Sequence, residues 1–128
     1  MTNPLEAIFC DDIRREDNGK LLIIGAYGGN IIVNKLPVQL RLSIWIRATD
    51  LPESPSPGLI KISVNAEQVH QIDISDRAQD DTGLTQFLLI GVPIDLEAPS
   101  RITVELKIDD DKTERRAEIE VTPAAGER

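Results

Sequence analysis

The chain has 128 residues, of which 41% are apolar, and this size fits one domain with its own core. Its 14 Lys and Arg against 22 Asp and Glu give a formal net charge of −8, so we expect no nucleic-acid partner. No apolar run approaches the ~20 residues that span a bilayer, and the first residues lack the pattern of a signal peptide. Because Cys10 is the single cysteine, we expect a cytoplasmic protein without an intrachain disulfide and without membrane contact.

Alternation of apolar and polar residues is the main structural signal. From Val38 to Ala48 every even position is apolar, and every odd position except Trp45 is polar. Side chains of a strand point alternately to opposite faces, so this segment is a half-buried strand. The pattern recurs along the chain and predicts an all-β protein. In chain order, the predicted strands span residues 5–10, 20–27, 30–33, 38–49, 59–66, 69–74, 84–92, 102–108 and 114–121.

The segments between these strands carry turn residues. Gly28 and Gly29 can supply the positive φ of a tight hairpin, so we expect strands 20–27 and 30–33 to pair. Residues 50–58 form a proline-rich loop, because proline has no backbone donor for a central strand. Strand 84–92 is a nearly continuous apolar run, which predicts burial on both faces.

Short strands with turn signals between them are typical of a β-sandwich or barrel. We predict a single antiparallel β-sandwich of about eight strands, immunoglobulin-like or C2-like. The domain is expected to span residues 1–122 and to end in a flexible tail at 123–128. Its first strand and its C-terminal strand are the candidates for sheet edges, where a partner strand could pair.

The polar face of strand 38–49 carries a candidate protein interface at Arg41, Trp45 and Arg47. Trp and Arg recur at binding hot spots, so this face could contact a protein partner or a second copy of the chain. In the alternative interpretation, Trp45 lies under a loop or under the N-terminal strand and belongs to a second small core.

Clustered aspartates suggest a candidate calcium site. Asp11 and Asp12 follow the first strand, and Asp109, Asp110 and Asp111 lie in a turn near the C-terminus. Calcium takes six to eight oxygen ligands, often from carboxylates on adjacent loops. The spacing matches no defined calcium loop, and aspartate is also a favoured turn residue, so both interpretations stay open.

The sequence offers no catalytic constellation. His70 is the only histidine, and Cys10 ends an apolar strand where a buried cysteine behaves as a small hydrophobe. Nucleophile, base and orienting group are not assembled by any named residues. We therefore expect no enzymatic activity and no cofactor.

One N-terminal motif points to a known family. Residues 9–14 read Phe-Cys-Asp-Asp-Ile-Arg, Gly19 and Lys20 follow, and residues 24–27 read Ile-Gly-Ala-Tyr. This pattern resembles a family of small uncharacterised bacterial proteins, some of them phage-associated. The resemblance implies a single bacterial cytoplasmic β-domain without an assigned activity, cofactor or substrate.

The motif residues also have roles in a scaffold, and we favour those roles over a ligand site. Asp11 or Asp12 can cap the turn after the first strand, and Arg14 can pair with a nearby carboxylate. The Tyr27 hydroxyl is expected to anchor the following hairpin by bonding to backbone.

Taken together, these features indicate a non-enzymatic protein-interaction or structural module of bacterial or phage origin, acting through self-association or a protein partner. The alternative is a calcium-binding or ligand-binding C2-like domain that uses the acidic loops.

Overall fold

The computed structural model describes residues 2–49, 51–52, 57–108 and 114–124, and these residues form eleven strands and no α-helix. The strands are β1 (Thr2–Pro4), β2 (Glu6–Cys10), β3 (Asp12–Arg15), β4 (Leu21–Ile24), β5 (Ile31–Val33), β6 (Val38–Thr49), β7 (Gly58–Val64), β8 (Glu67–Asp73), β9 (Leu84–Leu96), β10 (Ser100–Ile108) and β11 (Glu114–Pro123). The prediction of an all-β protein is confirmed. Among the described residues, no helix is present that could cross a membrane.

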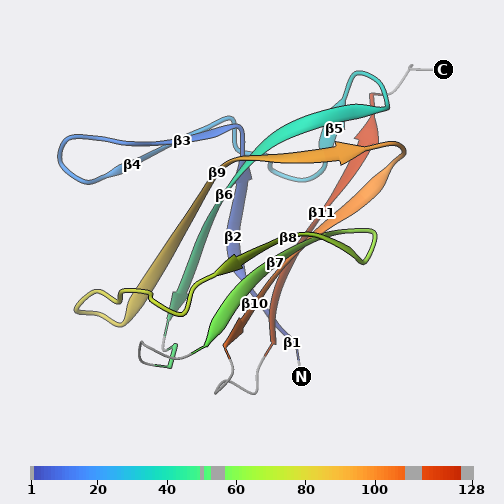
Figure 1. Ribbon diagram of the computed structural model, residues 1–128. Helices are drawn as coiled ribbons and strands as arrows, with labels where there is room; N and C mark the ends of the chain where they lie inside the picture. The colour runs from blue at the N-terminus through green and yellow to red at the C-terminus, as the bar shows by residue number, and fades with distance from the viewer. Residues whose placement is uncertain (1, 50, 53–56, 109–113, 125–128) are drawn as a thin grey trace.

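Three sheets organise the strands (Figure 1). The six-stranded sheet has the order β1–β11–β10–β7–β8, with β5 also paired to β11, and the three-stranded sheet has the order β2–β6–β9. The third sheet is the β3–β4 hairpin, which projects from the rest of the molecule as an arm (Figure 1). Both larger sheets contribute buried side chains to one hydrophobic core.

Strand β6 shows why alternation predicts the fold well. Its bounds are those expected from the sequence, and Leu42, Ile44 and Ile46 are fully buried in the core. On β7, alternation predicts that Ile60, Ile62 and Val64 point inward; Ile60 and Ile62 are buried, and Val64 is partly buried against the core. Each of these strands buries one face against the core, so the period of two in the sequence follows directly from the pleat of the strand.

Ser43 interrupts this regular pattern. A bulge shifts the register of β6 against β9 between Leu42 and Ile44, and Ser43 is fully buried here although alternation predicts it on the exposed face. The buried Ser43 hydroxyl accepts a bond from the Gly91 backbone N–H (3.1 Å) and donates to the Asp11 carbonyl (3.3 Å). Ser43, which alternation predicts to be exposed, is therefore buried and connects β6 to Asp11 and to Gly91.

Three predictions about the strands and their pairing are wrong. The expected hairpin across Gly28 and Gly29 does not form, because β4 pairs with β3 and β5 pairs with β11. Residues 11–19 are expected to be a connection, but they contain strand β3. Ile13 is the one buried side chain of this strand. The prediction of an antiparallel sandwich also fails at β11, because β1 and β5 both run parallel to it. These pairings join segments far apart in the chain, which local turn signals do not report.

The edges of the sheets differ in part from those expected. β2 lies at an edge of the three-stranded sheet, as predicted for the first strand. The C-terminal strand is not an edge, since β1 and β5 pair with it on the side opposite β10. β11 continues to Pro123, and the Ala124 N–H donates to the Val33 carbonyl (2.8 Å), while residues 125–128 lie outside the described part.

Candidate interaction surfaces

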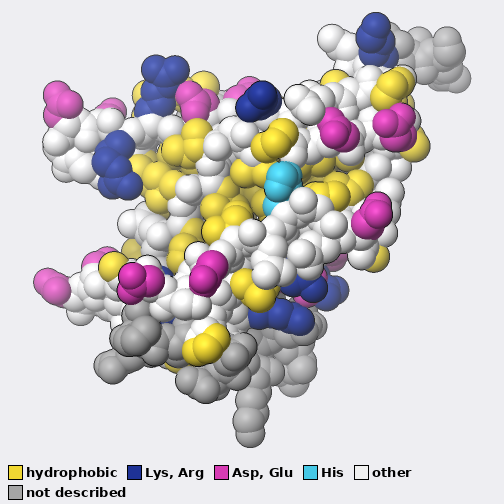
Figure 2. Space-filling view, viewed as in Figure 1, with side chains coloured by type: hydrophobic (Ala, Val, Ile, Leu, Met, Phe, Trp, Pro, Cys, Tyr) yellow, Lys and Arg dark blue, Asp and Glu magenta, His cyan; other side chains and the backbone are white. Residues whose placement is uncertain are grey.

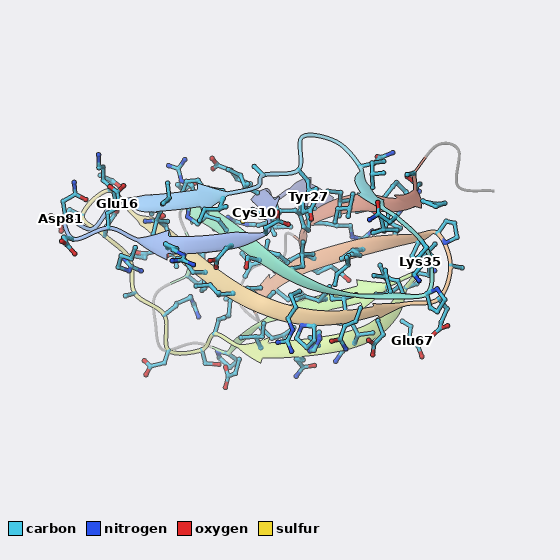
Figure 3. All side chains as sticks on the ribbon, turned by 90° about the horizontal axis from the view of Figure 1, so that it is seen from above. Cys10, Glu16, Tyr27, Lys35, Glu67 and Asp81 are labelled. Atoms are coloured by element: carbon cyan, nitrogen blue, oxygen red, sulfur yellow. The ribbon has the colours of Figure 1, made fainter. Side chains whose placement is uncertain are left out.

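The N-terminal motif closes the corner where β2 leads into the β3–β4 hairpin. The Asp11 N–H donates to the Ile24 carbonyl (2.9 Å), and the Tyr27 N–H donates to the Phe9 carbonyl (2.8 Å). The Tyr27 hydroxyl donates to Asp11 Oδ1 (2.7 Å), so it anchors the corner through a carboxylate and not through backbone as expected. Figure 3 shows Cys10 and Tyr27 next to each other at this corner. The contacts of the motif agree with a scaffold role.

Tyr27 gives this corner a pH dependence. Burial, together with the hydrogen bond to the Asp11 carboxylate, raises the pKa of Tyr27 from 10.0 to about 12. A raised pKa means that the folded protein binds the proton more tightly, so the stabilisation is present below pH 10 and is lost as the pH rises through about 12. We expect Tyr27→Phe to cost about 0.5–1.5 kcal/mol at pH 7 and to flatten the loss of stability above pH 10. Urea unfolding of both proteins between pH 7 and 11.5 checks this; parallel curves would contradict it.

Asp12 has partners within the chain. Its Oδ1 accepts from the Ile13 N–H (2.9 Å), and its Oδ2 pairs with Arg14 Nε (3.0 Å). The hydrogen bond from Arg14 holds the pKa of Asp12 below its usual range. Within the described residues, no group of three His, Cys, Asp or Glu side chains is placed to hold a metal ion. The other predicted ligands, Asp109, Asp110 and Asp111, lie outside the described part of the chain.

Trp45 lies on the outer face of the three-stranded sheet, half-buried. It is in register with Ile8 of β2 and Leu88 of β9, and its Nε1 donates to Gln86 Oε1 (2.8 Å). The Arg47 guanidinium lies over the indole ring, 5.4 Å from its centroid. Trp45 and Arg47 therefore form one cluster, in which the ring is partly covered by its own neighbours.

Arg41 does not join this cluster. Arg41 is exposed, lies beyond the Ser43 bulge and is in register with Pro93. Four residues along a strand separate it from Trp45 by about 13 Å. Arg47 pairs with Glu6 (3.0 Å), which holds the guanidinium in place over the ring. The predicted interface is thus divided into a Trp45–Arg47 cluster and a separate arginine.

Strand β9 provides a surface that the sequence prediction missed. It is the longest strand of the protein, and β6 is the single described strand that pairs with it. Its segment 84–90 carries no charged residue, and Ile90 is 55% exposed. The prediction that this run is buried on both faces is wrong, because Gln86 and Ile90 are exposed. Figure 2 shows apolar side chains gathered along β9 and beneath the β3–β4 arm.

Cys10 and His70 lie in different environments. Cys10 is buried and its thiol donates to the Ser43 carbonyl (3.6 Å), and burial together with the Asp11 charge raises the pKa of this thiol. His70 Nε2 lies 2.7 Å from the Pro93 carbonyl, so it links β8 to β9. A buried thiol with a raised pKa is a poor nucleophile.

Comparisons with known proteins place the chain in a family. No curated protein and no solved structure matches it. One family model matches residues 5–122, which is most of the chain and includes both the N-terminal motif and β9. The chain therefore belongs to the family of unknown function DUF6941.

Proposed function

We propose that this protein is a non-enzymatic assembly module, in which β9 of one copy pairs with β9 of a second copy. The observation that carries the proposal is the unpaired edge of β9 over residues 85–90, which follows Leu84, whose backbone groups are bonded to Asp80, and carries no charge. Edge strands present free backbone donors and acceptors, and proteins usually protect such edges with charge or proline. Pro93 protects the later part of β9 in this way, whereas residues 85–90 lack any such protection.

The chemistry of this edge favours a second copy as the partner. Antiparallel pairing about a two-fold axis at Leu88 would place Gln86 of one copy opposite Ile90 of the other. Like charges opposite each other destabilise a strand pair, and residues 84–90 contain none. The pairing would join two three-stranded sheets into one continuous sheet, so backbone hydrogen bonds would supply the affinity.

The proposal also includes the fold type and the cellular location that the sequence predicts. We infer that the two larger sheets form a β-sandwich of the immunoglobulin-like or C2-like kind, which is supported by their shared hydrophobic core. The bacterial origin rests on the resemblance of the N-terminal motif, and a cytoplasmic location is supported by the single cysteine, Cys10, which is buried and free. Trp45 and Arg47 would flank the pairing edge on the outer face, since Trp45 is in register with Leu88 of β9.

A charge placed at the edge tests the proposal. We expect the wild-type chain to be a dimer by light scattering and Ile90→Lys to be a folded monomer, because lysine at an edge opposes strand pairing. Ile32→Lys is the matched control: Ile32 on β5 is 57% exposed and Ile90 is 55% exposed, so both changes add one charge to a similar surface position. The control is expected to remain a dimer.

Two results would overturn the proposal. One is a monomeric wild-type chain over the concentration range tested. The other is a dimer that Ile90→Lys leaves intact and Trp45→Ala dissociates without unfolding, since that result would place the contact on the Trp45–Arg47 cluster. Thermal unfolding of each variant shows whether the loss of the dimer reflects the edge or the fold.

A further inference from the structure

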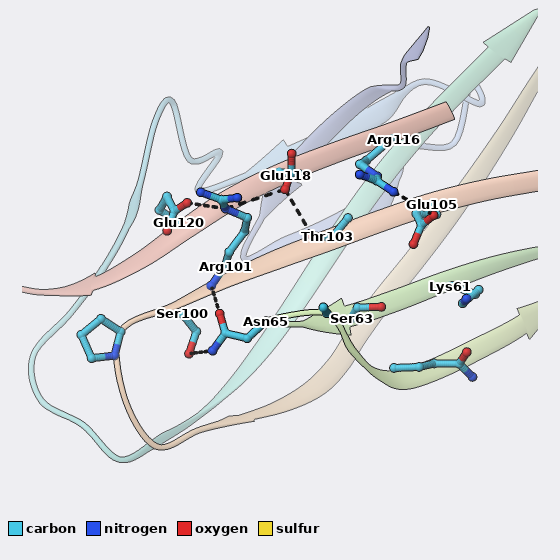
Figure 4. Close-up of a pocket in the computed structure, with 13 residues that line it drawn as sticks. Lys61, Ser63, Asn65, Ser100, Arg101, Thr103, Glu105, Arg116, Glu118 and Glu120 are labelled. Carbon is cyan, nitrogen blue, oxygen red and sulfur yellow. Dashed lines mark hydrogen bonds and ion pairs between the residues drawn. The ribbon is translucent and has the colours of Figure 1, made fainter. Parts of the chain in front are cut away.

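The outer face of the six-stranded sheet carries a hollow of about 540 Å³. Strands β7, β10 and β11 form its floor, and their side chains project from this one side of the sheet (Figure 4). Glu105 of β10 is in register with Lys61 of β7 and with Arg116 of β11, so the three side chains form one cross-strand row. Ser63 follows Lys61 by two residues on the same face. The hollow lies on the other sheet from β9 and is independent of the proposed pairing.

Three hydrogen-bond donors in this part of the hollow have no partner among the described residues. The Lys61 ammonium makes no ion pair within the described residues, and the Ser63 hydroxyl makes no hydrogen bond there and stays open to the hollow. The Nε of Arg116 is buried and also unpartnered. Buried polar groups in folded proteins are nearly always hydrogen-bonded, so the unpartnered Nε of Arg116 is an exception. The Lys61 and Ser63 donors lie near it, and one acceptor in the hollow could bond to this group of donors.

The charge of this row favours an anion. The Arg116 guanidinium pairs with Glu105 (3.3 Å), and Lys61 adds a second cation next to a single carboxylate. Two cations against one anion leave a local formal charge of +1 in a protein whose net charge is −8. Guanidinium and ammonium groups bind carboxylate and phosphate oxygens through charge-assisted hydrogen bonds.

At the opposite end of the hollow, carboxylates outnumber cations. Arg101 Nε lies 2.6 Å from Glu120 and 3.7 Å from Glu118, so two carboxylates share one guanidinium. These carboxylate oxygens keep free acceptor positions, which suit the hydroxyl groups of a ligand. The hollow therefore offers donors for an oxyanion at one end and acceptors for hydroxyls at the other.

We propose that this hollow binds a small hydroxylated anion, a sugar that carries a carboxylate or a phosphate group. The oxyanion lies between Lys61 and Arg116, where it accepts from both cations and from the Ser63 hydroxyl. The sugar hydroxyls donate to the carboxylates at the Glu118 and Glu120 end. The volume lies within the range of small-molecule sites and exceeds what a single anion needs.

Calorimetric titration with three probes tests this site. We expect glucuronic acid and glucose 6-phosphate to bind, and neutral glucose to bind at least about tenfold more weakly because it lacks the oxyanion. Lys61→Gln is expected to weaken both anions by at least about tenfold. Lys20→Gln is the matched control, because it removes the same charge at the exposed turn before β4 and is expected to leave both affinities unchanged.

Three results would overturn the proposal: no binding of either anion, equal binding of glucose and the anions, or anion binding that Lys61→Gln leaves unchanged. Thermal unfolding of Lys61→Gln and Lys20→Gln is expected to match the wild type, since neither side chain belongs to the hydrophobic core. Ser63→Ala supplies a second variant and is expected to weaken the anions without affecting glucose.

Discussion

Truncation of Ile44 to alanine is expected to lower the free energy of unfolding by about 2–5 kcal/mol, the largest effect that we predict for this protein. Ile44 is fully buried, and it is in register with Phe9 of β2 and Leu89 of β9. The substitution removes apolar contacts on both sides of the central strand and leaves a cavity that its neighbours fill only in part. Chemical denaturation monitored by Trp45 fluorescence measures the change.

An isoleucine-to-alanine substitution at an exposed position shows how much of the effect of Ile44→Ala is due to burial. Ile32→Ala removes the same atoms at a side chain that is 57% exposed, so we expect a change within about 0.5 kcal/mol. Similar losses in both variants would show that the core does not lie between the two larger sheets. The slope of the free energy of unfolding against denaturant concentration is expected to stay the same in both variants, since neither alters the surface exposed on unfolding by much.

Gly25→Ala is expected to cost about 2–3 kcal/mol of stability, although it adds only one methyl group. Gly25 has a φ of +67°, a conformation that L side chains rarely adopt. An added Cβ would also collide with the Asp11 carboxylate, which accepts the hydrogen bond of the Tyr27 hydroxyl. The backbone strain contributes roughly 1–2 kcal/mol and the disturbed hydrogen bond about 1 kcal/mol.

Gly28→Ala is the matched control for this prediction. No atom lies within 4 Å of a Cβ added at Gly28, and its φ is outside the left-handed region, so we expect little effect on stability. Repeating Gly25→Ala in an Asp11→Ala background removes the collision and should leave only the backbone cost of about 1–2 kcal/mol. Equal costs in both backgrounds would show that Asp11 does not constrain this corner.

The candidate surfaces were predicted from sequence only in part. The exposed side of β6 was recognised, and Trp45 and Arg47 do lie together on it. Alternation assigns Arg41 to the same face as Trp45 and Arg47, but it does not show that the distance along the strand keeps Arg41 out of their cluster. The row of Lys61, Glu105 and Arg116 is not predictable from the sequence, because it joins three strands whose register is set by tertiary pairing.

The sequence by itself determined the all-β class, the bounds of β6 and the inward residues of β6 and β7. Those features follow from a period of two in a strand that buries one face, which is a local property. Only the tertiary structure decided that β5 joins β11 in parallel, and that β9 lies at an edge although residues 87–90 are all apolar. The physical reason is that an apolar run reports the tendency of side chains to leave water. The neighbour of a strand depends instead on backbone hydrogen bonds between distant segments, and every residue except proline offers the same donor and acceptor.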